Sequence, residues 1–241
     1  MNKIWIYGDS FSDPNYQNQY LDAPDTHSWP NRLAQRYDIR NRSIEGSGPD
    51  YALKLLLDDI DVTPVEDLKN ITLIFLQSDV HRFNLRGIYK DDDPKQQVYA
   101  KNIATGEHKH PSKMFMKSLF QHLAVHGWHG REQLKFYSTV NSIAHNFDRV
   151  AYITVGGFHP VYSPIIQPVD NLTFVPSNLM ASSLKEPEAT MDLPDPRPNH
   201  FSPRCHDYIL EHITQWLERA SSLTFEELDS VAANVSLPTH G

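Results

Sequence analysis

Short apolar segments recur along the chain and are separated by amphipathic ones. The first, Lys3–Tyr7, is rich in aromatic and branched residues and stops at Gly8-Asp9-Ser10, a pattern typical of a β-strand that ends in a turn. Asn70–Leu76 is almost continuously apolar, as expected for a strand that is covered on both faces. The other predicted strands are 38–44, 150–155 and 172–175.

Helical spacing of apolar residues fills the gaps between these strands. Ser28 precedes a predicted helix that reaches Tyr37 and has Pro30 in its first turn, where serine and proline are favoured. Asp50 is a second predicted cap, and Ser202-Pro203 opens the last helix. Further helices are predicted at 114–123 and 132–146. The predicted apolar faces are Tyr51, Leu53, Leu55, Leu56 and Leu57 after Asp50, and Cys205, Ile209, Ile213 and Trp216 in the last helix.

Apolar strands that alternate with helices indicate a parallel sheet with helices on both faces. The predicted fold class is therefore α/β, a three-layer α/β/α domain with a parallel, flavodoxin-like sheet of about five strands. We predict one domain over 1–220, with a polar loop or lid inserted at 80–112. Loops of that length within a compact domain are usually functional or partly disordered. A tail at 221–241 is predicted to add one short helix at 225–233.

The composition narrows the class of protein. The 241 residues hold 22 Lys and Arg against 30 Asp and Glu, a formal net charge of −8. This balance argues against a nucleic-acid partner, because neutralising phosphates requires surplus cations. No apolar run approaches the roughly 20 residues that cross a bilayer, so no membrane span is expected. The first residues lack the apolar stretch of a signal peptide, and we expect a cytoplasmic protein.

Cysteine and metal chemistry are not favoured. Cys205 is the one cysteine, so it can form neither an intramolecular disulfide nor a cysteine-based zinc site. Its neighbour His206 would not face it on a helix. His122, His126 and His129 have the spacing of one helix face, but no carboxylate accompanies them in a metalloenzyme motif. We expect no metal and no cofactor.

Polar residues follow the predicted strands, where an open parallel sheet places its active site. Gly8–Asp13 follows the first strand, Asn41–Gly46 the second and Gln77–Asp79 the third, while 195–202 precedes the last helix. Together these loops offer a serine, backbone N–H donors, a hydroxyl or amide, and a histidine. Acyl transfer from an ester requires that set of groups.

The same loops resemble the sequence blocks of the SGNH/GDSL hydrolase superfamily. Gly8-Asp9-Ser10-Phe11-Ser12-Asp13 is similar to the first block, Asn41–Gly46 to the second, and Asn199-His200-Phe201-Ser202-Pro203 to the last. The resemblance runs in order and spacing over nearly the whole predicted domain, which makes individually weak motifs more specific.

This resemblance implies roles for particular residues. Ser10 would be the nucleophile and His200 its general base, with His206 as a competing base. The backbone N–H groups of Ser10 and Gly46 would line the oxyanion hole that stabilises the tetrahedral intermediate. Gly46 would also suit a turn that needs a positive φ.

Two positions depart from the family pattern. Ser78 stands where the third block has an asparagine, and a hydroxyl holds its one donated hydrogen bond less rigidly. Arg197 stands where the last block has an aspartate, and an arginine cannot accept the histidine N–H. Asp195 is then the nearest acid and Asp192 a poorer one. Without either, Ser10 and His200 would work as a dyad.

The sequence therefore predicts a serine hydrolase of carboxylic esters on a small molecule or a glycan, such as an O-acetyl or other short-chain ester. Two other classes stay open. One is a catalytically weakened relative that binds a ligand or carbohydrate, motivated by the two departures. The other is a phosphate or nucleotide site at the first loop, which Asp9 and Asp13 disfavour because they place negative charge there.

Overall fold

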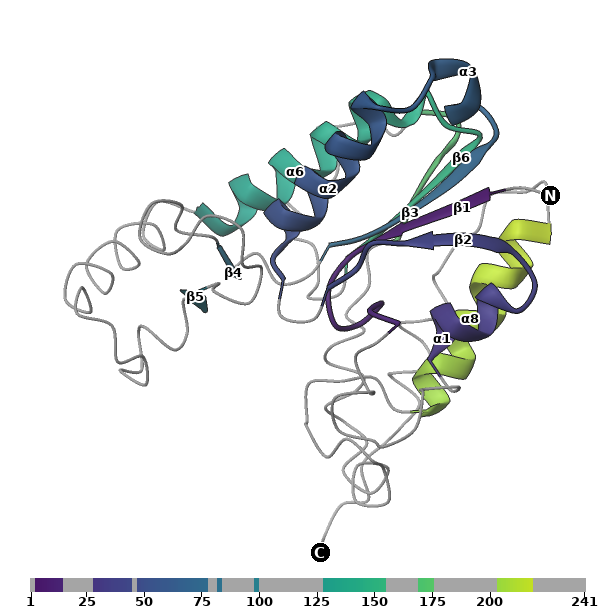
Figure 1. The fold of residues 1–241 in the computed structure, drawn as a ribbon. Coiled ribbons are helices and arrows are strands. Elements are labelled where there is room, and N and C mark those ends of the chain that lie inside the picture. Colours follow the sequence, from purple (N-terminus) through teal and green to yellow (C-terminus); the bar gives the residue numbers. More distant parts are fainter. Residues whose placement is uncertain are drawn as a thin grey trace, which may run out of the picture.

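The structure, a computed structural model, describes residues 3–14, 28–44, 47–77, 82–83, 98–99, 128–154, 169–175 and 203–218. Five parallel strands form its main sheet (Figure 1). They are β1 (Lys3–Tyr7), β2 (Asp38–Asn41), β3 (Ile71–Gln77), β6 (Arg149–Thr154) and β7 (Leu172–Val175). The order across the sheet is β2-β1-β3-β6-β7, which is the flavodoxin-like order. The predicted fold class is confirmed.

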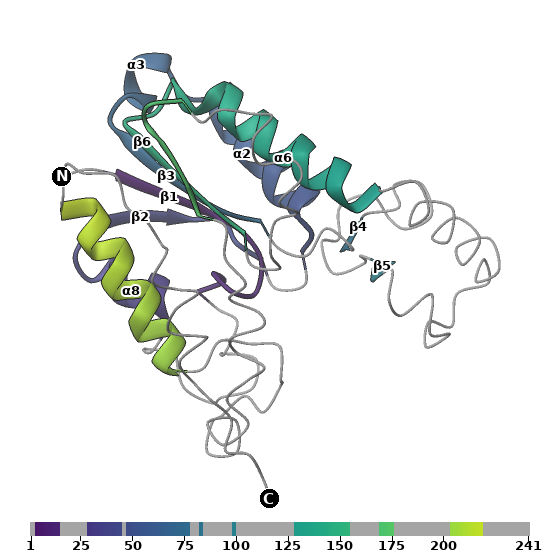
Figure 2. The same ribbon diagram turned by 180° about the vertical axis from the view of Figure 1, so that it is seen from behind.

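Helices cover both faces of this sheet and make it the middle of three layers. α2 (Pro49–Asp61) and α6 (Trp128–Ala144) lie side by side on one face. α1 (Trp29–Ala34) and α8 (Pro203–Glu218) lie together on the other face (Figure 1). The view from behind shows α8 along that face (Figure 2). A short helix, α3 (Val65–Leu68), connects α2 with β3.

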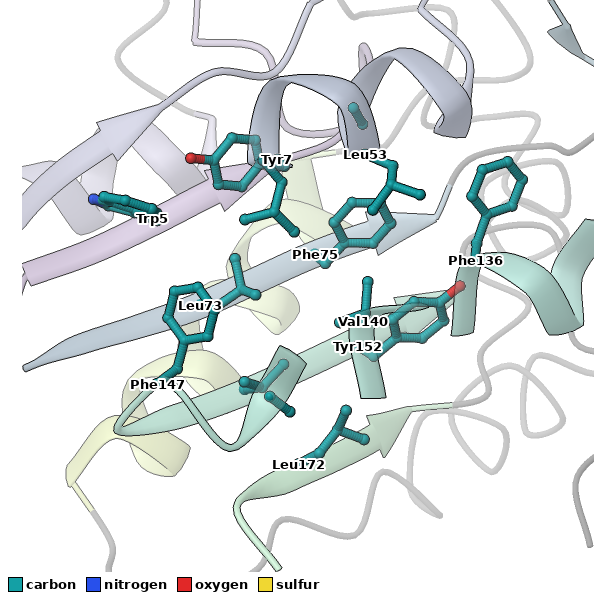
Figure 3. Close-up of a cluster of buried hydrophobic side chains, with 14 of the residues drawn as sticks. Trp5, Tyr7, Leu53, Leu73, Phe75, Phe136, Val140, Phe147, Tyr152 and Leu172 are labelled. Atoms are coloured by element: carbon teal, nitrogen blue, oxygen red, sulfur yellow. The ribbon is translucent and has the colours of Figure 1, made fainter. Parts of the chain in front are cut away.

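Strand side chains alternate between two hydrophobic clusters, because successive residues of a strand point to opposite faces. On the α2 and α6 side, the rings of Phe75 and Tyr152 stack with centroids 5.6 Å apart (Figure 3). On the α1 and α8 side, Ile4, Ile6 and Ile74 are buried against the helices. The helix residues that complete this second cluster are Trp29, Leu33, Ile209, Ile213 and Trp216.

The predicted buried stripe of the last helix is confirmed at Ile209, Ile213 and Trp216, which are 2%, 1% and 4% exposed. The side chain of Cys205, the fourth member of that stripe, lies outside the described residues. The predicted strand at 172–175 matches β7 residue for residue.

The predicted start and face of α2 need correction. Gly48, not Asp50, occupies the N-cap position, and Pro49 is the first helical residue, where proline is favoured. Asp50 lies in the first turn instead. Leu57 is 41% exposed, whereas Asp59 is buried. Asp59 takes a place on the sheet-facing side because β1 and β2 supply polar partners for it, as described below.

Within the predicted insertion at 80–112, the structure describes a short antiparallel pair, β4 (Arg82–Phe83) and β5 (Val98–Tyr99). The rest of that segment, the predicted helix at 114–123 and the tail at 221–241 lie outside the described residues. The single-domain division therefore stays a prediction. Among the helices that are described, none combines the length and the apolar character that crossing a bilayer requires.

Candidate active site

The loop after β1 forms a tight turn at the carboxyl edge of the sheet. Asp9 is fully buried, and its Oδ1 accepts the Phe11 N–H at 3.1 Å. The Ser12 N–H donates to the Asp9 carbonyl oxygen at 3.0 Å. These two hydrogen bonds close the backbone around Ser10, because short aspartate side chains readily bond to the backbone two residues ahead.

Ser10 lies at the centre of this turn and is 7% exposed. Its neighbours Asp9 and Ser12 are both held by hydrogen bonds. In contrast, no hydrogen bond between the described residues uses the Ser10 hydroxyl. The turn is therefore built by the residues around Ser10, and the hydroxyl is left for other chemistry.

The loop after β2 is joined to the serine turn. The Ser12 hydroxyl donates to Ser43 Oγ at 2.8 Å. Asn41 donates from Nδ2 to the Ser12 carbonyl oxygen at 2.7 Å, and its Oδ1 accepts the Ser43 N–H at 2.9 Å. Asn41, the last residue of β2, thus fixes both loops with one side chain.

Gly8 links the same two loops through its backbone carbonyl group. Its carbonyl oxygen accepts the Ile44 N–H at 3.3 Å and the Ser47 hydroxyl at 3.2 Å. A Cβ at this position would lie 2.3 Å from Ser12 Oγ and 3.0 Å from Leu76 Cβ. Only glycine fits between the turn and β3, so the close approach explains the residue type.

α1 is hydrogen-bonded to the serine turn, and α8 in turn is hydrogen-bonded to the first residue of α1. Trp29 is fully buried and donates from Nε1 to the Phe11 carbonyl oxygen at 2.9 Å. The Trp29 N–H, at the first residue of α1, donates to Nδ1 of His206 at 3.3 Å. His206, on α8, thereby supplies the cap that the sequence assigned to Ser28, whose side chain makes no capping bond.

This contact also defines the tautomer of His206. An amide N–H needs an acceptor lone pair, so Nδ1 is unprotonated and the neutral ring carries its hydrogen on Nε2. Neither nitrogen can then remove a proton from a serine while the helix cap is intact.

Gln77, which the sequence analysis placed in the loop after the third strand and gave no role of its own, is the buried last residue of β3. Gln77 is 1% exposed, and its Oε1 accepts a hydrogen bond from the Tyr152 hydroxyl on the neighbouring strand β6. The available signal was its place: its amide comes directly after the apolar run at 73–76.

The sequence analysis also missed an ionic cluster around the buried Asp59, between β1, β2 and α2. The Tyr7 hydroxyl donates to Asp59 at 2.7 Å, and the same carboxylate pairs with Arg40. Arg42 Nε lies 3.9 Å from Asp59. Burial, reinforced by the Asp59 carboxylate, raises the pKa of Tyr7 far above its usual range. The cluster fixes β2, and with it the loop that carries Ser43.

Of the predicted site residues, the structure describes Ser10 and places it at the expected sheet edge. Gly46, Ser78, Asp195 and His200 lie outside the described residues, so the oxyanion hole and the triad stay predictions. The residues Ile44 and Ser47 on either side of 45–46 both contact the Gly8 carbonyl oxygen.

Metal binding was searched for in the described part of the chain. No group of three or more His, Cys, Asp or Glu side chains there could hold an ion. The side chains of the histidines at 122, 126 and 129, whose spacing the sequence analysis noted without favouring a metal site, lie outside the described residues.

Comparisons with known proteins were made for the whole chain. It matches no protein-family model and no curated protein. The solved structures to which it is similar include one of the psychrotrophic esterase EstA from Pseudoalteromonas sp., inhibited by monoethylphosphonate. The two are 15% identical, the match covers 91% of this chain and 100% of EstA, and the TM-score is 0.39. Identity and TM-score are both low, so this similarity assigns neither a family nor an activity to the chain.

Proposed function

We propose that this protein is a serine hydrolase of the SGNH type that cleaves carboxylic esters with Ser10 as nucleophile. The observation that carries the proposal is the serine turn. Ser10 follows β1 at the carboxyl edge of the sheet, neighbouring residues hold its backbone by hydrogen bonds, and its hydroxyl has no partner among the described residues. A fixed backbone with an uncommitted hydroxyl suits a nucleophile.

The proposed reaction has two balanced halves. Ser10 Oγ attacks the ester carbonyl carbon while His200 takes its proton, and the π-electron pair moves to the carbonyl oxygen. Collapse of this intermediate breaks the bond to the alcohol, which leaves with the proton from His200. Water then repeats the attack on the acyl-enzyme and gives its proton to His200, which passes the proton to Ser10 Oγ as the bond to the acyl group breaks and the acid leaves.

The developing oxyanion would be stabilised by the N–H groups of Ser10 and Gly46 and by the Ser78 hydroxyl. Each such donor contributes about 10²- to 10³-fold in turnover. The links from Gly8 to Ile44 and Ser47 support this assignment, because they fasten the chain on both sides of Gly46 to the serine turn.

Asp195 would orient His200 by accepting its second N–H. His200 is preferred over His206 as the base because the Nδ1 of His206 accepts the Trp29 N–H. Asp195→Asn should then lower kcat by roughly a thousandfold or more by favouring the wrong tautomer. Asp192→Asn should be nearly neutral, and a mild effect of both would leave a dyad of Ser10 and His200.

The proposed substrate is a small or glycan-linked ester with a short acyl group. The segments 16–20 and 82–99 carry tyrosines among polar and charged residues, which suits a sugar or small alcohol better than a long acyl chain. No cofactor enters this chemistry, because side chains and water supply every group.

Turnover of p-nitrophenyl acetate and of acetylated sugars tests the proposal. The wild type, Ser10→Ala and His200→Ala are compared with Ser142→Ala, a surface serine on α6 that bonds to Thr139. We expect loss of turnover in the first two variants and wild-type rates in the last. Equal rates in the wild type and Ser10→Ala would exclude the esterase and favour a ligand-binding role.

A further inference from the structure

Gln77 combines burial with an amide whose two ends differ in their contacts. Its oxygen accepts a hydrogen bond from the Tyr152 hydroxyl. No hydrogen bond between the described residues uses its Nε2. Buried amides almost always satisfy their donors as well as their acceptors. The Gln77 amide uses its oxygen but not its Nε2 within the described residues, so a hydrogen-bond acceptor for Nε2 remains to be identified.

The amide lies level with the serine turn. Tyr7, the last residue of β1, pairs with Phe75 on β3. Continuing this register two residues past the end of β1 puts Gln77 level with Asp9, directly before Ser10. The alignment holds up to the edge, since a Cβ at Gly8 would lie 3.0 Å from Leu76 Cβ. Gln77 thus ends the strand that neighbours the nucleophile.

Tyr152 holds the amide in one orientation. Its ring stacks on Phe75 with centroids 5.6 Å apart (Figure 3). It also meets the Tyr137 ring edge-on, with centroids 5.3 Å apart. Burial raises the pKa of Tyr152 well above its usual range, so the hydroxyl keeps its proton and remains a donor. Because Tyr152 takes the amide oxygen, the two N–H bonds of Gln77 point away from it.

We propose that Gln77 donates an N–H to the oxyanion of the Ser10 reaction, with Tyr152 as the residue that positions it. The inference rests on the proposed function and extends it. In the SGNH/GDSL pattern an asparagine carboxamide stands at the position of Ser78. In this chain the carboxamide would come from Gln77, one residue earlier. A donor fixed before the reaction stabilises the developing charge without reorganising, whereas a serine hydroxyl in general holds its one donated hydrogen bond less rigidly.

The test separates a chemical role from a structural one. Gln77→Met removes the donor but also leaves the Tyr152 hydroxyl without its acceptor, so it combines two effects. Gln77→Met with Tyr152→Phe removes both polar groups and leaves no unsatisfied hydroxyl, which should restore stability. We expect kcat to fall on the order of a hundredfold or more in this double variant, with KM little changed.

Two comparisons complete the experiment. Thr72→Val, at the other end of β3, removes a buried hydroxyl that has no partner among the described residues, and kcat should stay at the wild-type value. Affinity for a trifluoromethyl ketone, which forms an oxyanion on a serine, should fall with kcat in the double variant, while affinity for the corresponding alcohol should not.

The outcomes distinguish the two proposals. If the double variant regains stability and also turns over like the wild type, Gln77 has a structural role and this inference is wrong, while the esterase proposal stands. If Ser10→Ala hydrolyses ester as fast as the wild type, both proposals are wrong. Low kcat with restored stability and weak ketone binding supports the assignment of Gln77.

Discussion

At the scale of single residues, Gly8 determines how closely the serine turn approaches β3. Its missing side chain leaves room for the Ser12 hydroxyl, which bonds to Ser43 at 2.8 Å. Ser10, the proposed nucleophile, and the β2 loop are therefore positioned relative to one another by a contact that involves neither Ser10 itself nor a proposed oxyanion donor.

Gly8→Ala should lower kcat about a hundredfold, because displacement of a reacting group by about 1 Å has effects of that size. The new methyl would lie 2.3 Å from Ser12 Oγ and must push the turn away from Ser43. The fall in kcat is measured by ester turnover, and a thermal melt of the same variant shows whether the protein is still folded. Ser12→Ala, which removes the same hydrogen bond without adding an atom, should lose activity in the same direction. Full activity in Gly8→Ala would show that the turn tolerates this shift.

Tyr7 couples stability to alkaline pH. Its pKa is raised in the folded protein, so above about pH 10 the unfolded chain loses this proton while the folded one keeps it. Stability is therefore independent of this group at lower pH and falls as pH rises through the unfolded value, by up to about 1.4 kcal/mol per pH unit.

Urea unfolding between pH 9 and 11 checks this coupling. Tyr7→Phe should lower stability at neutral pH by about 1 kcal/mol, through loss of the hydrogen bond to Asp59, and should fall less steeply than the wild type above pH 10. Burial also raises the pKa values of Tyr137 and Tyr152. These two tyrosines therefore make stability fall with rising pH in the wild type and in Tyr7→Phe alike. Identical slopes would contradict an effect of Tyr7.

At the scale of elements, α1 depends on a cap from a distant helix. The Trp29 N–H donates to Nδ1 of His206, 177 positions away in the chain. His206→Ala leaves this buried N–H without an acceptor and should cost about 1–2 kcal/mol of unfolding free energy. His206→Asn should recover part of that loss, because the Asn Oδ1 occupies the place of Nδ1. Equal stabilities of the Ala and Asn variants would show that packing, not the cap, holds the helix.

The strands could be predicted from sequence and the polar contacts between elements could not. β1 and β7 match their predicted bounds, because continuous burial on both faces selects branched and aromatic residues. Asp59 was missed because its partners Tyr7 and Arg40 lie on other elements. Nothing in the local spacing of α2 separates a buried aspartate from an exposed one.

At the scale of the whole molecule, the strand order places the serine turn where a flavodoxin-like sheet binds its ligands. β1 lies between β2 and β3, so the chain turns in opposite directions on its two sides, and sheets of this order bind their ligands at the carboxyl edge beside that point. The sequence located Ser10 at this edge because a parallel sheet follows from alternating strands and helices.

The hydrogen bonds that support the serine turn and Gln77 could not be predicted from the sequence. The hydrogen bond from Ser12 to Ser43 joins residues 31 positions apart, and the one from Tyr152 to Gln77 joins residues 75 apart. Serine, asparagine and glutamine occur in many loops, so only the folded chain shows which of them meet.

Covalent labelling of Ser10 tests the central claim most directly. A fluorophosphonate reacts with a serine that a general base activates: the serine oxygen bonds to phosphorus and fluoride leaves. The wild type, Ser10→Ala and Ser142→Ala are incubated with the reagent, and peptide mass spectrometry locates the adduct. We predict one adduct on Ser10 in the wild type and in Ser142→Ala, and none in Ser10→Ala. An unmodified Ser10, or an adduct that persists in Ser10→Ala, would contradict the account.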